Sequence, residues 1–171
     1  RAARQRVFTP GNWRVEFFGV ARRRCGMDVE TYNSLGGQVA LVTGATRGIG
    51  AAIASELADR GATVYAGARE PADVTDRDLR PLELDLTDED DVVAAVNRVD
   101  DEKGRLDILV NNAGVMDGRS GLAEMPTTVV DETLTTNLRG PLLLTKYALP
   151  LLLGDGGGRV DVPEHRAGVR S

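Results

Sequence analysis

Residues 43–50 read Thr-Gly-Ala-Thr-Arg-Gly-Ile-Gly, and this glycine-rich turn decides how the rest of the chain is organised. The preceding residues, 39–42, form a short apolar run of the kind that makes a buried parallel strand. The following segment, residues 51–60, is rich in alanine and is closed by Gly61, which predicts a helix with a glycine stop. We therefore expect a strand, a tight turn and a helix in succession.

The turn has the chemistry of a phosphate site. Glycine allows the backbone to approach a ligand that a Cβ atom would hold off. The helix after the turn directs free N–H groups and the positive end of its dipole to the same point. A glycine turn can also serve the fold alone, but in this strand–helix context we expect a nucleotide pyrophosphate. The predicted contact residues in the turn are Gly44, Thr46, Arg47, Gly48, Ile49 and Gly50.

The composition narrows the class of protein. A chain of 171 residues with 42% hydrophobic residues fits one globular domain of ordinary size. No apolar run reaches the ~20 residues that span a bilayer, so we expect no membrane partner. The single cysteine, Cys25, and the single histidine, His165, argue against an internal disulfide and against a zinc or cysteine-cluster metal site. We therefore expect a cytoplasmic, metal-free protein.

The charge of the chain changes near Met27. Seven arginines but only one acid, Glu16, precede it, together with Trp13 and all three phenylalanines, whereas the chain from Asp28 onward is acidic. A basic arm with interleaved aromatic residues could bind nucleic acid or an anionic membrane. Its apolar residues follow no helix or strand period, so we favour a translated upstream region that is not part of the domain. We assign residues 1–34 to this extension and expect no nucleic-acid partner.

Strands and helices alternate after the turn. The pattern predicts strands at 62–68, 81–84 and 106–110, a helix from a cap at Thr87 to about Lys103, and a helical segment at 129–153 with a kink at Gly140-Pro141. Arg159-Val160 indicates the opening of a fifth strand. The alternation predicts an α/β fold with a parallel sheet covered on both faces. We place the domain at 35–160 and an irregular tail at 161–171.

Four motifs in this order resemble those of the short-chain dehydrogenase/reductase family, over about residues 37–160. They are the turn at 43–50, Asp85-Leu86, Asn111-Asn112-Ala113-Gly114, and Asn137 within Thr136-Asn137-Leu138-Arg139-Gly140. The resemblance implies a three-layer αβα Rossmann-type doubly wound sheet, incomplete here at about four strands plus the start of a fifth, with the fourth strand left as an edge. It also implies hydride transfer between NADP(H) and a small-molecule carbonyl or secondary alcohol, and a homo-oligomer formed through the helix at 129–153.

Asp85 and Leu86 follow the predicted third strand. A carboxylate there can accept a hydrogen bond from an exocyclic amine, and the resemblance implies that Asp85 contacts the adenine while Leu86 contributes backbone. A loop aspartate can also cap Thr87 and its neighbours, and the two roles can coexist.

The asparagine run ends the predicted fourth strand, beside the point where ligands sit in a doubly wound sheet. The small residues Ala113 and Gly114 would let a ribose or nicotinamide lie against the backbone, and Asn111 is predicted to join this contact. In the family the paired asparagines also tie neighbouring strands together. A structural role for Asn112 is therefore at least as well supported as a ligand contact.

The charge near the turn predicts the cofactor. A sheet that binds NAD usually places an acid about 20 residues beyond the glycine turn, where it holds the ribose 2′-hydroxyl. In this chain the predicted second strand ends at Ala68 and Arg69, and Arg47 supplies a second guanidinium. Two guanidiniums suit a 2′-phosphate, which they can hold through forked hydrogen bonds. We therefore expect NADP rather than NAD, with Glu70 directed to solvent.

The catalytic residues of the family are only partly present. Carbonyl reduction needs a proton donor and groups that stabilise the developing alkoxide, and the family uses a serine, a tyrosine, a lysine four residues beyond it, and an asparagine that supports a relay water. Asn137 matches the asparagine, but the 171 residues contain no Tyr-x-x-x-Lys, and Tyr147 has Leu151 four residues on. Two explanations are open: a truncated or frame-shifted reductase, or a nucleotide-binding or structural remnant without chemistry.

Overall fold

A computed structural model of the chain describes residues 34–116, 121–154 and 159–161. The predicted N-terminal extension, residues 1–34, and the predicted tail, residues 161–171, therefore lie almost wholly outside the described residues. No helix in the described ranges is both long and apolar enough to cross a membrane.

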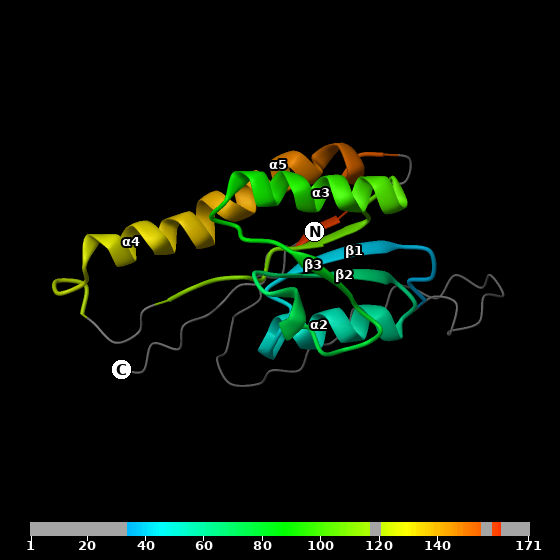
Figure 1. The fold of residues 1–171 in the computed structure, drawn as a ribbon, viewed down its shortest axis with the longest axis horizontal. Coiled ribbons are helices and arrows are strands. Elements are labelled where there is room, and N and C mark those ends of the chain that lie inside the picture. Colours follow the sequence, from blue (N-terminus) through cyan, green and yellow to red (C-terminus); the bar gives the residue numbers. More distant parts are fainter. Residues whose placement is uncertain (1–33, 117–120, 155–158, 162–171) are drawn as a thin grey trace, which may run out of the picture. The chain divides into compact units, whose positions relative to one another are not determined.

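The described chain forms one parallel β-sheet with the strand order β3-β2-β1-β4-β5. The strands are β1 (Val39–Thr43), β2 (Thr63–Ala68), β3 (Arg80–Glu83), β4 (Ile108–Val110) and β5 (Arg159–Asp161). This order places β1 in the centre, where all five of its residues are buried. The predicted doubly wound parallel sheet is confirmed, including its short fifth strand (Figure 1).

Helices cover both faces of this sheet. They are α2 (Gly48–Asp59), α3 (Glu89–Lys103), α4 (Thr127–Leu134), the π-helical segment η2 (Thr135–Arg139) and α5 (Gly140–Leu152). In Figure 1, α2 lies on one face while α3 and α5 lie together on the other, and α4 extends past the sheet and buries no residue. Such layers follow when parallel strands alternate with crossover helices that each have one apolar face.

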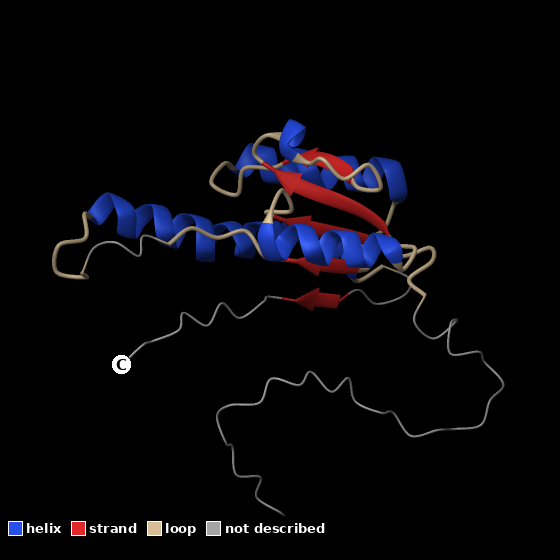
Figure 2. Ribbon diagram, turned by 90° about the horizontal axis from the view of Figure 1, so that it is seen from below, coloured by secondary structure: helices blue, strands red, loops and turns tan. Residues whose placement is uncertain are grey.

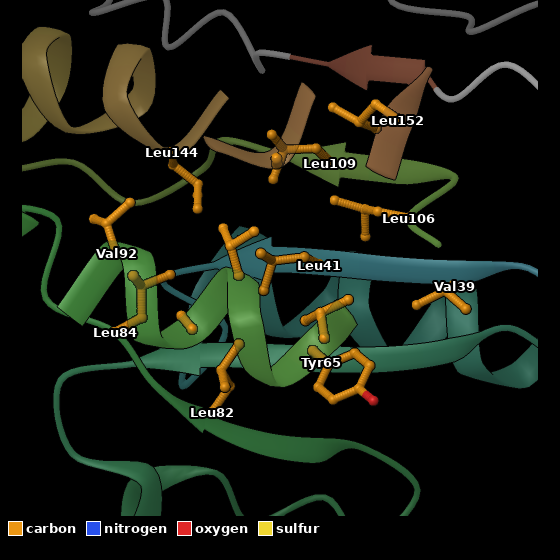
Figure 3. Packing of buried hydrophobic residues seen from close by; sticks show 14 of the residues in the cluster. Val39, Leu41, Tyr65, Leu82, Leu84, Val92, Leu106, Leu109, Leu144 and Leu152 are labelled. Carbon is orange, nitrogen blue, oxygen red and sulfur yellow. The ribbon is translucent and has the colours of Figure 1, made fainter. Parts of the chain in front are cut away.

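The side chains of β1 alternate between two hydrophobic clusters. Val39 and Leu41 belong to the cluster that includes residues of α3 and α5, whereas Ala40 and Val42 belong to the cluster with α2. Figure 3 shows the first cluster, in which side chains from the helices pack against leucines of the sheet. Because successive strand residues point to opposite faces, one short apolar run serves both layers. The glycine turn therefore follows directly after the central, fully buried strand of the sheet.

The long helical segment departs from α geometry one turn before the predicted kink at Gly140-Pro141. Residues Thr135–Arg139 are π-helical, and the Gly140 N–H donates to the carbonyl of Thr135. Pro141 has no N–H, and in an α-helix its ring would collide with the carbonyl of Asn137. A wider turn before Pro141 relieves this clash, so α4, η2 and α5 follow one another without an intervening loop. Figure 2 shows the α4 end of this helical segment extending past the strands.

Two further expectations are corrected by the structure. Thr87 does not cap α3; the N-cap is Asp88, whose carboxylate accepts a hydrogen bond from the Asp90 N–H at 2.8 Å. A carboxylate also interacts favourably with the positive end of the helix, which a hydroxyl does not. The fourth strand is not an edge, because β5 pairs with all three residues of β4.

Candidate functional site

The carboxyl ends of β1 and β4 meet at the centre of the sheet, and the chain leaves them toward opposite faces. β1 leads into α2 on one face, whereas β4 leads through α4 to α5 on the other. Ligands of open parallel sheets bind at such a topological switch point. The glycine turn, Arg69, Asp85 and the asparagine run all follow carboxyl ends of strands and therefore share this edge of the sheet.

The glycines of the turn have different surroundings. Gly44 has a φ of +65°, and a Cβ there would lie 2.9 Å from the Cα of Ala113. A Cβ on Gly50 would collide with the Asn112 side chain and the Gly44 carbonyl. Gly48 also has a positive φ, +60°, but a Cβ there would meet no atom of the described residues within 4 Å. Gly44 and Gly50 thus close the turn against β4, and Gly48 marks its open side.

Thr43, the last residue of β1, links the turn to the end of β4. Its Oγ1 accepts hydrogen bonds from the backbone N–H groups of Asn112 (3.0 Å) and Ala113 (2.9 Å). The Asn112 side chain completes the link by donating to the carbonyls of Thr43 (3.0 Å) and Gly44 (3.2 Å). Asn112 therefore has the strand-tying geometry that the sequence predicts for it.

Asn111 is directed away from the glycine turn. Its side chain is 5% exposed and its Nδ2 donates to Thr145 Oγ1 of α5 at 3.3 Å. Its Oδ1 is buried and has no hydrogen-bond partner among the described residues. Of the other predicted contact residues in this run, Ala113 lies beside Gly44 of the turn, and Gly114 lies beside the Asn137 side chain.

Asn137 lies in the π-helical segment and holds the loop after β4. Its Oδ1 accepts from the Val115 N–H at 2.8 Å, and its Nδ2 donates to the Val115 carbonyl at 2.7 Å. A Cβ on Gly114 would approach Asn137 Oδ1 to 3.3 Å. The Asn137 carbonyl cannot form the usual α-helical bond, because the residue four positions on is Pro141.

The loop after β3 is fixed from two sides. Asp85 Oδ1 accepts from both the backbone N–H and the hydroxyl of Thr87, each at 2.8 Å, so the predicted capping role of Asp85 is present. Leu86 is 4% exposed, and a Cβ on Gly140 would come within 2.6 Å of its Cβ. Only a glycine at the start of α5 therefore lets the helix rest on this loop.

The edge of the site near α2 is positive. Arg47 is the exposed N-cap of α2, and the first turn of this helix contains no acid. Arg69 is exposed directly after β2. Within the described ranges neither guanidinium forms an ion pair. Glu70 is exposed, as predicted, and its carboxylate also accepts from the Ala72 N–H at 3.4 Å and so caps the next turn of the chain.

The family model for short chain dehydrogenases matches residues 38–161, which include every element described above. The chain belongs to this family. In the described ranges no three His, Cys, Asp or Glu side chains gather as a metal site would require.

Several curated short-chain dehydrogenases are similar to this chain. The cis-4-hydroxycyclohexanecarboxylate dehydrogenase of Sinomonas cyclohexanicum is 40% identical over 131 residues, which cover 72% of this chain and 53% of that protein. The 3-oxoacyl-acyl-carrier-protein reductase FabG of Vibrio harveyi is 36% identical over 133 residues, covering 74% of this chain and 54% of that protein. The chain spans about half the length of these relatives.

Solved structures of short-chain dehydrogenases are similar as well. A metagenomic short-chain oxidoreductase in complex with NADP superimposes with a TM-score of 0.71 and 36% identity, covering 75% of this chain and 61% of that one. A short-chain dehydrogenase/reductase of Mycobacterium marinum gives a TM-score of 0.73 at 29% identity, covering 80% and 59% respectively.

The sequence motifs assign no role to two residues that organise this site, Thr43 and Val115. Thr43 carries a recognisable signal, since a hydroxyl directly before the first glycine stands at the end of the central strand. Val115 carries none, because only its backbone atoms take part.

Proposed function

We propose that this chain binds NADP and carries the cofactor-binding half of an oxidoreductase that acts on a small-molecule carbonyl or secondary alcohol. The observation that carries the proposal is the open side of the glycine turn at Gly48, at the N-terminus of a helix whose first turn has no acid. A pyrophosphate there would receive free N–H groups and the positive end of the helix. A similar solved structure is in complex with NADP, which supports the same cofactor here.

The proposed contacts divide along the length of the cofactor. Arg47 and Arg69 take the 2′-phosphate, since guanidinium groups match its oxygens through forked hydrogen bonds. Asp85 and Leu86 take the adenine. We assign contact with the pyrophosphate to Gly44, Thr46, Gly48, Ile49 and Gly50. We assign contact with the ribose and nicotinamide to Asn111, Ala113 and Gly114. Because the Asn111 side chain is directed to α5, its part in this contact falls to the backbone.

Bound NADP(H) supplies or accepts the hydride. The part we assign to Asn137 is to hold a water that relays a proton. Both ends of its side chain are engaged with Val115, so its backbone position is fixed. Its carbonyl oxygen has no α-helical donor because of Pro141, and an acceptor of this kind suits an ordered water.

Titration of the 171-residue chain with NADPH and with NADH, followed by nicotinamide fluorescence, tests the binding proposal. We expect saturable binding with NADPH roughly tenfold or more tighter, because charge-assisted hydrogen bonds to the 2′-phosphate contribute about 1.5–3 kcal/mol. A chain that is folded by circular dichroism and binds neither nucleotide would refute the proposal.

A nucleotide-binding module without turnover is the second candidate. It needs only the cofactor contacts proposed above. Oxidation of NADPH in the presence of small ketones and aldehydes separates the two candidates: steady turnover supports the oxidoreductase, whereas tight NADPH binding with no turnover supports the module.

We also propose a cytoplasmic location and self-association. One cysteine in 171 residues fits a compartment where disulfides do not form. Leu134, Leu138, Leu142 and Leu149 are exposed and recur at intervals of four or seven residues, so they share one face of the helix at 129–153. Such a face suits a second copy of the chain.

A further inference from the structure

The crossover between β2 and β3, residues 69–79, contains no α-helix. Parallel strands are usually joined by a crossover of a dozen or more residues built around one. Here the regular structure is a single 3₁₀ turn, η1 (Pro71–Asp73), closed by the Asp73 N–H on the Glu70 carbonyl at 3.1 Å. A segment of this kind has few backbone hydrogen bonds of its own to fix its conformation.

Contacts with the α2 face hold this crossover instead. Val74 and Leu79 pack into the hydrophobic cluster that contains residues of α2. Ser55 Oγ of α2 donates to Asp76 Oδ2 at 2.6 Å, and Asp76 Oδ1 accepts from the Asp78 N–H at 3.0 Å. Among the hydrogen bonds of the described residues, the one between Ser55 and Asp76 is the one that joins the crossover to α2.

The two joined elements are the ones that carry the two guanidiniums. Arg47 caps α2 at its N-terminus, and Ser55 lies about two turns further along the same helix. Arg69 is the first residue of the crossover, which the hydrogen bond of Asp76 attaches to α2. We propose that Ser55 and Asp76 are positioning residues for cofactor selection: their hydrogen bond holds the crossover on α2 so that Arg69 faces the same 2′-phosphate as Arg47. This inference rests on the proposed binding of NADP.

The chemistry of Asp76 supports this role. The hydrogen bond from Ser55, followed by that from the Asp78 N–H, lowers the pKa of Asp76, so the carboxylate remains ionised and a strong acceptor at neutral pH. Both of its oxygens accept these bonds, and among the described residues Asp76 forms no ion pair with Arg69.

The direction of the change in NADPH affinity distinguishes a positioning role from a purely electrostatic effect of the Asp76 charge. Replacing Asp76 by alanine removes a negative charge, and charge alone would strengthen the binding of an anionic nucleotide. Positioning predicts the reverse, since a loosened crossover presents Arg69 less often. Replacement of Ser55 by alanine changes no charge and should act in the same direction. NADH has no 2′-phosphate, so its affinity should stay the same in both variants.

The test is a fluorescence titration of the full chain with NADPH and with NADH. In Ser55→Ala and Asp76→Ala we expect the preference for NADPH to fall roughly three- to tenfold, as the loss of one hydrogen bond would give. Asp76→Asn keeps an acceptor for Ser55 and should retain most of the preference. Glu56→Ala is the matched control, because it removes a hydrogen bond of 2.7 Å to Arg60 within α2 and touches neither the crossover nor the turn.

A second arm uses Arg69→Ala as the background. If Ser55 acts through Arg69, Ser55→Ala should leave the remaining preference unchanged there. An unchanged preference in Ser55→Ala and Asp76→Ala, or an equal weakening of NADPH and NADH, would overturn the positioning role while leaving the proposed cofactor intact. If the unmodified chain binds neither nucleotide, the proposed function itself fails and the positioning role falls with it.

Discussion

Thr43 shows how much of the site depends on one hydroxyl. Its side chain is 1% exposed and accepts two backbone N–H groups from the end of β4. Thr43→Val keeps the shape but removes the hydroxyl that accepts from the part-buried Ala113 N–H, at a cost of about 1–3 kcal/mol, whereas the Asn112 N–H keeps its bond to the Val110 carbonyl at 3.1 Å. We therefore expect the free energy of unfolding in urea to fall by about 1–3 kcal/mol. Thr43→Ser, which keeps the hydroxyl, is the control, and an equal loss in both variants would contradict this role.

Arg69 decides the cofactor if the proposed contacts hold. Arg69→Ala removes a charged donor to the 2′-phosphate, so NADPH should bind about 10- to 100-fold more weakly while NADH is unaffected. Competitive titration of both nucleotides measures the effect. Arg60→Ala, at the opposite end of α2, is the matched control for a lost surface guanidinium. A parallel loss of NADPH and NADH affinity would show that Arg69 does not read the 2′-phosphate.

Among the elements, β2 and α3 are joined by a hydrogen bond from Tyr65 Oη to Glu102 Oε2 at 2.8 Å. Burial of the ring, together with the hydrogen bond to Glu102 and its negative charge, raises the pKa of Tyr65 to about 12. An unfolded tyrosine has a pKa of about 10. Because the pKa of Tyr65 is higher in the folded state, the contribution of Tyr65 to the free energy of unfolding is complete below about pH 10. This contribution is lost as the pH rises toward 12.

The corresponding experiment measures the free energy of unfolding between pH 9 and pH 12 for the unmodified chain and for Tyr65→Phe. We expect the unmodified chain to lose stability more steeply above about pH 10, because its unfolded state gives up the Tyr65 proton first. Parallel curves for the two proteins would show that Tyr65 titrates alike in both states.

The elements also show what can be predicted from sequence. The structure confirms the apolar run of β1, the helix end before Gly61, the end of α3 at Lys103 and the turn between β1 and α2. All of these depend on local burial and backbone freedom. Pro141 predicts a distortion of this helix, but hydrophobic periodicity does not encode that the distortion takes the form of a π-helical segment at Thr135–Arg139.

The same distinction holds within the site. The glycine turn and Asn112 are predictable because residue type and strand position determine what they can do. The direction of the Asn111 side chain depends on its hydrogen bond to α5, a helix that begins about thirty residues later. The N-cap of α3 depends on which of two neighbours, Thr87 or Asp88, takes the capping position. Where tertiary packing selects among equivalent local options, sequence alone leaves the outcome open.

In the molecule as a whole, the leucine face of the helix at 129–153 is the main exposed apolar feature of the described chain. Leu142 is 62% exposed, whereas Leu144, two residues on, is fully buried against the sheet. We expect Leu142→Glu with Leu149→Glu to shift the chain toward monomers, because a charge on such a face opposes its burial. Sedimentation velocity measures the change. Leu153→Glu, at the C-cap of α5, is the comparison, and an unmodified chain that is already monomeric would contradict self-association.

The hydrogen bonds of Thr43 also bear on how the protein is made. Their partners, Asn112 and Ala113, lie 69 and 70 residues further along the chain. On a ribosome that adds about 5–20 residues per second, this separation corresponds to a delay of roughly 3–14 seconds. During that interval the glycine turn and α2 have already been synthesised, but the strand that secures them has not. If the chain binds NADP as we propose, we expect a nascent chain to gain this affinity only after β4 has entered the sheet beside β1.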